Sequence, residues 1–243
     1  MISFVKEDNT IQYLYSKIGK HHIDAGTGNQ DSVYIGKICD ETYCLVVSDG
    51  VSSCKWAKTG SEATIDTIRT LSTKIYHNEI SIDDGDGIKR FIVRDWKNHF
   101  DESWNDYGTT INFVIWSRGI VLAGQIGDGL LIGVTDGENF LMTDMDENYS
   151  VETYALAEVV LKSSIQLTVR KNVNNLIAIA MTDGIGKEMN MESIYEFQDY
   201  FVDLIKNRDE ETRNKEVELW MSQLNQKNDD DKTIALMVLE GKT

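Results

Sequence analysis

Three short apolar runs in this sequence each lead to an aspartate that is followed by a glycine. The run at residues 45–48 leads to Asp49 and Gly50, and the other two lead to Asp128 and Asp183. A further acidic cluster, residues 229–231, precedes an apolar run instead of following one. Carboxylates fixed at the ends of buried strands supply the oxygen ligands that hard divalent cations prefer. A single Asp-Gly pair is typical of a turn, so it is the repetition that favours a metal site.

The composition is that of an acidic globular protein. Of its 243 residues 41% are hydrophobic and 26% are charged, and 40 acidic residues against 24 basic ones give a net charge of −16. This charge argues against binding to nucleic acid or to an anionic membrane, and no apolar run approaches the ~18 residues of a membrane span. No signal-peptide pattern is visible, and three cysteines without metal-ligand spacing are typical of a reduced, cytoplasmic protein.

The elements that must position the acids follow from the hydrophobic periodicity. Alternating or continuous apolar runs predict strands at residues 1–5, 11–18, 32–38, 42–48, 111–116, 120–126, 130–135, 139–143, 165–169, 176–181 and 233–239. Helical spacing predicts helices at residues 57–76, 88–100, 194–204 and 217–224. Residues 19–29 are predicted to form a polar loop, residues 151–156 fit either a strand or a helical turn, and Asp136 with Gly137 is assigned to a plain turn.

The order of these elements indicates the fold class. No linker, repeat or shift in composition divides the chain, so residues 1–243 are predicted to form one domain. Strands dominate the beginning, the middle and the end, with two pairs of helices inserted between them. Because this is not a βαβ alternation, a doubly wound parallel sheet is disfavoured. Two packed sheets with helices on their outer faces fit better.

Six short motifs then follow one another in an order that resembles a known family. They are Asn29-Gln30-Asp31-Ser32, Val47-Ser48-Asp49-Gly50, Gly108-Thr109-Thr110, Gly127-Asp128-Gly129, Thr182-Asp183-Gly184-Ile185 and Asp230-Asp231-Lys232-Thr233-Ile234. The series resembles the metal-dependent protein phosphatase type 2C family, in its bacterial branch. The resemblance implies an α+β fold, a four-layer α-β-β-α sandwich of two mainly antiparallel sheets flanked by helices. It also implies a binuclear Mg2+ or Mn2+ centre at one end of the sheets.

The activity that the resemblance implies is hydrolysis of phosphoserine and phosphothreonine in proteins. A water that bridges two divalent ions has a lowered pKa and can attack phosphorus in line, so no side-chain nucleophile is needed. The expected partner is a phosphoprotein substrate, a kinase or a kinase target, and neither nucleic acid nor a membrane is expected.

The resemblance carries over residue by residue. Asp49 resembles the carboxylate that bridges both metals, and Gly50 resembles the residue whose carbonyl binds one of them. Asp183 and Asp230 resemble further metal-binding carboxylates. Asp31 resembles the acid that holds metal-bound water, and Asp128 resembles a ligand of an optional third metal. Residues 229–231 are ambiguous by one register step, and we choose Asp230 because it stands three residues before Thr233.

The departures from the family pattern concern the groups around the metals. Much of the family has an acid at the position of Gln30, which can hydrogen-bond a metal-bound water but brings no charge. The arginine that grips the substrate phosphate is Gly26 here, and the candidate proton donor after Asp49 and Gly50 is Val51. Lys187 stands where a third metal would need an acid, so a third ion through Asp128 is doubtful.

The histidine segment ahead of Asp31 suggests a substitute for the missing arginine. Gly19-Lys20-His21-His22 resembles a bacterial branch in which a glycine and a histidine precede Gln-Asp-Ser. His22 is therefore our candidate for the phosphate contact, with Lys20 and His21 as neighbours. The alternative is an exposed loop histidine without a role.

Three rival interpretations account for parts of the sequence. Asp84-Gly85-Asp86 has the spacing of a haloacid-dehalogenase-type phosphatase but follows no buried strand. An EF-hand calcium-binding loop is excluded. If Gly87 were the glycine of such a loop, Ile82 would stand at its first ligand position and Val93 at its last, and neither side chain can bind calcium. The third rival is a pseudophosphatase that binds a phosphoprotein or regulatory partner, which the changes at Gln30, Gly26 and Lys187 would fit. Retention of the aspartates at 31, 49, 183 and 230 argues for an active enzyme instead.

Overall fold

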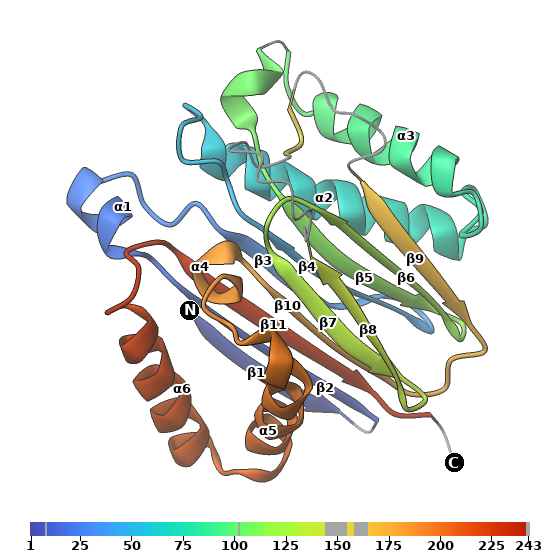
Figure 1. The fold of residues 1–243 in the computed structure, drawn as a ribbon. Coiled ribbons are helices and arrows are strands. Elements are labelled where there is room, and N and C mark those ends of the chain that lie inside the picture. Colours follow the sequence, from blue (N-terminus) through green and yellow to red (C-terminus); the bar gives the residue numbers. More distant parts are fainter. Residues whose placement is uncertain (8, 102, 144–154, 158–164, 242–243) are drawn as a thin grey trace.

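Two antiparallel sheets form the centre of the computed structural model, which describes all residues except 8, 102, 144–154, 158–164 and 242–243 (Figure 1). One sheet runs in the order β1 (Ile2–Glu7), β2 (Thr10–Lys17), β11 (Lys232–Leu239), β10 (Leu176–Met181), β7 (Leu130–Thr135) and β8 (Glu138–Thr143). The other runs β3 (Ser32–Cys39), β4 (Thr42–Ser48), β5 (Ile111–Ser117), β6 (Ile120–Ile126) and β9 (Gln166–Lys171).

Helices cover the outer faces of both sheets (Figure 1). The pair α2 (Ala57–Tyr76) and α3 (Gly85–Lys97) packs on the sheet that contains β4, and the pair α5 (Ile194–Asn207) and α6 (Glu210–Leu224) packs on the sheet that contains β11. The connecting segments within the described ranges contain the short helices α1 (Lys20–Ala25) and α4 (Asp183–Gly186) and the 3-10 turns η1 (Trp104–Tyr107) and η3 (Met191–Ser193). No helix in the described ranges is long and apolar enough to cross a membrane.

The apolar side chains of β4 show how the layers are built. Leu45 and Val47 point into the core between the two sheets, where they join Ala178 of β10. The alternate residue Val46 points outward into the core under α2, together with Ile68. Because both faces of this strand are covered, its sequence is an unbroken apolar run and shows no polar alternation.

This arrangement confirms the predicted α+β sandwich of four layers. Some details of the sequence prediction were wrong, and the helix predicted at residues 217–224 already begins at Glu210. The predicted loop at residues 19–29 contains α1, and the helix predicted at residues 88–100 begins earlier, where the Asp84 carboxylate accepts a hydrogen bond from the Gly87 amide at 2.8 Å. Most of the element predicted at residues 151–156 lies outside the described residues, although Leu156 forms an isolated bridge with Thr109.

Strand register brings the acid-bearing chain segments to one end of the sandwich. Met181, the last residue of β10, pairs with Leu130 at the start of β7 and with Ile234 near the start of β11. The turn before β7, the segment after β10 and the segment before β11 are therefore neighbours. They lie at the end that carries α1 and α4, away from the C-terminus (Figure 1).

Candidate active site

The backbone of Asp49 is fixed by the two threonines that follow Gly108. The carbonyl oxygen of Asp49 accepts hydrogen bonds from the Thr110 amide at 2.8 Å and from the Thr109 hydroxyl at 2.7 Å. The Asp49 amide donates to the Thr110 hydroxyl at 3.1 Å. These bonds use up the main-chain groups of Asp49 and leave its carboxylate to face the other acids.

Gly50 is a glycine for a packing reason that the sequence did not reveal. A Cβ added to Gly50 would lie 2.4 Å from the carbonyl oxygen of Ala57, the first residue of α2. The start of α2 therefore packs directly on the Asp49–Gly50 backbone, and any side chain at position 50 would push the helix away. The role of the Gly50 carbonyl as a metal ligand stays a prediction.

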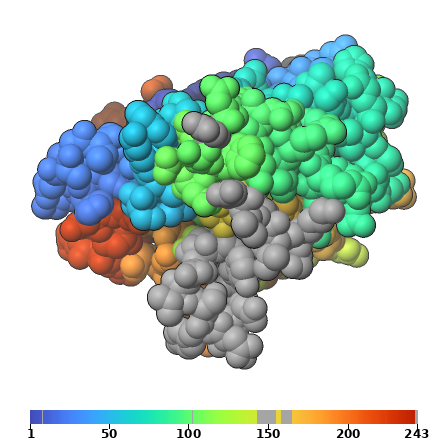
Figure 2. All heavy atoms as spheres, turned by 90° about the horizontal axis from the view of Figure 1, so that it is seen from above, coloured from blue at the N-terminus to red at the C-terminus, as the bar shows by residue number. Residues whose placement is uncertain are grey.

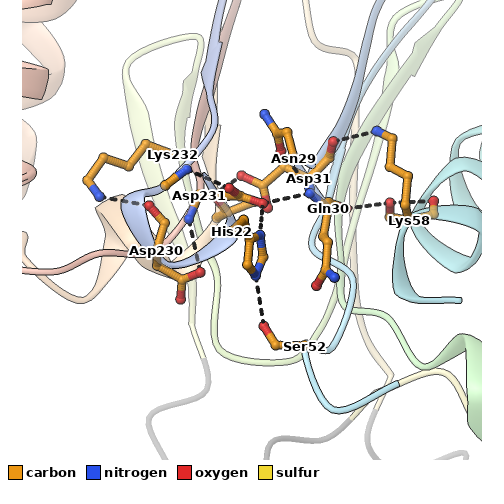
Figure 3. Close-up of polar contacts among 12 residues, drawn as sticks. His22, Asn29, Gln30, Asp31, Ser52, Lys58, Asp230, Asp231 and Lys232 are labelled. Carbon is orange, nitrogen blue, oxygen red and sulfur yellow. Dashed lines mark hydrogen bonds and ion pairs between the residues drawn. The ribbon is translucent and has the colours of Figure 1, made fainter. Parts of the chain in front are cut away.

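Asp31 is held by residues from four different segments. Its amide donates to the Asn29 side chain at 2.8 Å, its Oδ2 accepts from the Thr182 hydroxyl at 2.9 Å, and that hydroxyl accepts from the Thr233 amide at 3.1 Å. Lys58 of α2 donates to the Asp31 carbonyl oxygen at 2.8 Å, as Figure 3 shows. One carboxylate oxygen of Asp31 is thus fixed by the protein, while Oδ1 is buried and has no partner among the described residues.

Electrostatics shows that four of the predicted acids lie together. Burial, and then the charges of Asp31, Asp183 and Asp230, raise the pKa of Asp49 well above its usual range. Burial raises the pKa of Asp31 to about 7. Burial and the charge of Asp183 also raise the pKa of Asp230. Carboxylates that raise one another's pKa in this way are close together, and one of the four, Asp183, also pairs with a lysine, Lys187.

The three consecutive aspartates before β11 have three different surroundings. Asp229 is exposed, Asp230 is half-buried beside the acid group, and Asp231 is buried. The Asp231 carboxylate accepts from the Gly19 amide at 2.7 Å, from the Gln30 amide at 2.6 Å and from His22 Nδ1 at 2.8 Å (Figure 3). The structure therefore places Asp230 beside Asp49 and Asp183, whereas the Asp231 carboxylate is bound by two backbone amides and by His22.

His22 lies under the surface instead of on an open loop. Its side chain is buried, with Nδ1 on Asp231 and with Nε2 facing the hydroxyl of the exposed Ser52 at 3.5 Å. Lys20 is exposed and paired with Asp24, and His21 is exposed. Figure 2 shows the α1 segment in blue beside the cyan segment after Gly50, which agrees with the His22–Ser52 contact. The phosphate contact of His22 stays a prediction, and only Nε2 is placed to make it.

Asp128 is separated from the four-acid group by a lysine. Lys187 Nζ lies 2.7 Å from Asp128 Oδ2 and 2.6 Å from Asp183 Oδ2. This ammonium group thus stands between Asp128 and Asp183, and the role of Asp128 as a ligand of an optional third metal stays a prediction.

The group of Asp31, Asp49, Asp183 and Asp230 has the donor chemistry of a divalent-metal site. Its ligand atoms are carboxylate oxygens, and Asp31 Oδ1 and Asp183 Oδ1 are buried without a hydrogen-bond partner in the described part of the chain. The side chains do not form a finished coordination shell, since no three His, Cys, Asp or Glu residues among those described are arranged as ligands of one ion. The fit to Mg2+ or Mn2+ therefore rests on the chemistry of these oxygen donors and not on their present arrangement.

Several positioning residues were missed by the sequence analysis. Lys58, Thr182 and Thr233 hold the Asp31 segment, and Asp231 fixes the start of α1. Lys232 is buried and donates from Nζ to the Asp230 carbonyl oxygen at 2.9 Å, so it shapes the turn that presents Asp230. The two threonines and Asp231 belong to the recognised motifs, but the residues that they contact lie far away in sequence and leave no local signal.

The chain belongs to the protein phosphatase 2C family, because residues 18–222 match the sequence profile of that family. The fold agrees with solved structures of low sequence identity. RsbX in complex with magnesium superposes with a TM-score of 0.66 at 16% identity, over 99% of this chain and 100% of that one. The catalytic domain of the serine/threonine phosphatase PstP with two manganese ions gives 0.65 at 17% identity, over 95% and 99%. Stp1 from Staphylococcus aureus gives 0.61 at 15% identity, over 95% of each chain. No curated protein sequence matches this chain significantly.

Proposed function

We propose that this protein hydrolyses phosphoserine and phosphothreonine in proteins with the aid of two Mg2+ or Mn2+ ions held by Asp49, the Gly50 carbonyl, Asp183 and Asp230. The observation that carries the proposal is the group of four aspartates at one end of the sandwich, in which neighbouring carboxylates and burial raise the pKa of Asp49. The magnesium in RsbX and the two manganese ions in PstP support the choice of ions. Two such ions would supply Lewis-acid activation of a water and would offset charge on the phosphoryl oxygens.

The protein's own residues would orient the attacking water. Asp31 is fixed through Oδ2 by Thr182, and its buried Oδ1 is left as an acceptor. We assign to this oxygen the role of orienting the attacking water, from which it would accept a hydrogen bond. Gln30 is a second acceptor, since its Oε1 is buried without a partner among the described residues. Its amide cannot contribute charge, so the negative charge of this half of the site rests on Asp31.

The remaining parts of the proposal concern the context of the reaction. We infer one phosphatase domain over residues 1–243, working in the cytoplasm on a kinase or on the target of a kinase. The net charge of −16 and the lack of a disulfide among the described cysteines support this setting.

Turnover with and without metal tests the proposal. Wild-type protein with excess Mn2+ should hydrolyse p-nitrophenyl phosphate and a phosphothreonine peptide, and a chelator should abolish both activities. Asp49→Asn should reduce turnover more than about 100-fold, since it removes the carboxylate shared by both ions. Asp136→Asn is the matched control, because Asp136 also belongs to an Asp-Gly pair but serves a turn, accepting from the Asn174 and Asn175 amides.

The same assay separates the enzyme from the alternative of a binding module. Wild-type turnover no higher than that of Asp49→Asn would reject the enzyme. If such an inactive protein still bound the phosphothreonine peptide, a pseudophosphatase that recognises phosphoproteins would take its place.

A further inference from the structure

Lys187 contacts two acids that the sequence pattern assigned to metal binding. Its Nζ lies 2.6 Å from Asp183 Oδ2 and 2.7 Å from Asp128 Oδ2. Both distances are those of charge-assisted hydrogen bonds. The ammonium group is thus shared between two carboxylates in the way that a bridging cation would be.

Local geometry on α4 fixes the first of these contacts. Asp183 begins this short helix and Lys187 follows it by four residues, and the Lys187 amide donates to the Asp183 carbonyl oxygen at 3.0 Å. Residues four apart on a helical turn lie on the same face, so the lysine side chain reaches back to the aspartate.

Strand pairing fixes the second contact. Asp128 lies in the turn between β6 and β7, and Gln125 braces this turn by donating from Nε2 to the Gly127 and Gly129 carbonyl oxygens at 3.2 and 2.7 Å. A Cβ added to Gly186 would lie 3.0 Å from the Leu130 Cβ, so α4 packs closely against the start of β7. Asp128 and Lys187 are therefore brought together by the fold itself.

The two oxygens of Asp183 then have different tasks. Oδ2 is occupied by Lys187, while Oδ1 is buried and has no partner among the described residues. The carboxylate also raises the pKa of Asp49 through its charge, so it borders the four-acid group. One oxygen therefore remains available to that group while the other is bound to the lysine.

We propose that the Lys187 ammonium takes the place of a third metal ion, so that the site binds two divalent ions and Asp128 is a partner of the lysine and not a metal ligand. The proposal rests on the two-ion centre proposed above. Asp128, Asp183 and Lys187 together carry one negative charge, whereas the two aspartates alone would carry two. Removing the lysine charge should therefore create a site for a further divalent ion between them.

Manganese stoichiometry tests this inference without relying on activity. Folded wild-type protein should bind two Mn2+ ions, measured from the signal of free Mn2+ in electron paramagnetic resonance titrations. Lys187→Met should bind three, because it removes the charge and keeps the length of the side chain. Lys187→Met combined with Asp128→Asn should return to two. Lys206→Met is the control for net charge, since Lys206 pairs with Glu240 outside the site, and it should also bind two.

Each result decides between the proposals. Three ions in the wild-type protein, or two in Lys187→Met, would overturn the role of Lys187 and leave the two-ion centre standing. No Mn2+ binding by the wild-type protein would overturn the metal centre itself, and this inference with it. Circular dichroism of each variant establishes that the titrated protein is folded, and Lys187→Arg, which keeps the charge, should again bind two ions.

Discussion

Asp230 and Asp231 are neighbours in the chain but lie in opposite electrostatic surroundings. Asp231 accepts hydrogen bonds from two backbone amides and from His22, so its charge is compensated within the protein. The Asp230 carboxylate accepts one backbone amide, that of Asp231 at 2.9 Å, but it borders Asp183 and Asp49, and burial together with the charge of Asp183 raises the pKa of its carboxyl group. One carboxylate is satisfied by the fold, and the other belongs to a group that needs a cation.

This difference separates a structural acid from a ligand-binding acid better than burial does. Asp231 is the more deeply buried of the two, yet its three donors make it part of the fold. The four-acid group includes buried oxygens without donors, which is costly unless a ligand binds there. The hydrogen-bond partners of the individual carboxylate oxygens thus distinguish the two roles.

The largest effect on stability is expected at Asp231. Asp231→Ala would leave the amides of Gly19 and Gln30 buried without an acceptor, at a cost of about 3 kcal/mol in the free energy of unfolding. The loss should be nearly the same with and without Mn2+, because the lost hydrogen bonds come from backbone amides and His22 and not from the proposed metal ligands. Denaturant unfolding measures it. Asp229→Ala, which changes the exposed neighbour, should alter stability by less than about 0.5 kcal/mol. A Mn2+-dependent loss in Asp231→Ala would place this residue in the metal group.

A substitution at Asp49 is expected to raise the stability of the metal-free protein, in contrast to the loss expected for Asp231→Ala. Asp49→Asn removes one of several mutually repelling charges, so the metal-free protein should gain about 1 kcal/mol of stability. The wild-type protein should gain about 2.7 kcal/mol for each site at Mn2+ concentrations 100 times the dissociation constant, and most of this gain should vanish in Asp49→Asn. Thermal unfolding with a chelator measures the stability of the metal-free proteins, and thermal unfolding with Mn2+ measures the gain from metal binding. Equal stabilisation of the two proteins by Mn2+ would show that the ions bind elsewhere.

The metal-free protein should also lose stability as the pH rises through the acid group. Burial raises the pKa of Asp31 from its usual 3.8 to about 7, so the native state binds more protons than the unfolded state between these values. Stability therefore falls as the pH increases from about 4 to about 7. Asp31→Asn should flatten this fall, as measured by denaturant unfolding with a chelator present.

Asp136 provides the control for the sign of the pH effect. Hydrogen bonds from the Asn174 and Asn175 amides lower the pKa of this carboxyl group. Its contribution to stability is present above the usual pKa of 3.8 and is lost as the pH falls through the lowered value. Asp136→Asn should therefore change the free energy of unfolding least at low pH. A wild-type stability that rises between pH 4 and 7 and is unaffected by Asp31→Asn would contradict the electrostatic account of the four acids.

The layers of the fold were predictable because they follow from local patterns. The run at residues 45–47 is apolar on both faces, and the structure buries it between α2 and the second sheet. By contrast, the sequence of α1 predicts a loop, because Lys20, His21 and Asp24 interrupt any apolar stripe. This helix is fixed by its contacts with Asp231, which is more than 200 residues away and gives no local signal.

The candidate site also contains some features that local sequence predicts and others that depend on distant contacts. The motifs around Asp31, Asp49, Asp183 and Asp230 identified acids that the structure brings together, since these acids lie next to the ends of strands that meet at one end of the sandwich. The spacing of Asp183 and Lys187 already weakened the case for a third ion, but it could not reveal the contact of Lys187 with Asp128. That contact depends on the pairing of β7 with β10, which is a property of the folded sheet.

The smallest expected effect distinguishes two roles for His22, and it refines the comparison between Asp231 and the acid group. If His22 mainly supports Asp231, His22→Ala should cost about 1–2 kcal/mol of stability. His22→Asn should recover about half of that cost, because the asparagine amide can replace Nδ1 as a donor to Asp231. The KM for a phosphothreonine peptide should then be nearly the same in His22→Asn and the wild-type protein. If Nε2 contacts the phosphate, both variants should raise KM several-fold, because asparagine has no group at that position. Denaturant unfolding and steady-state kinetics on the same preparations separate these outcomes. The burial of His22 and its short contact with Asp231 lead us to expect the first.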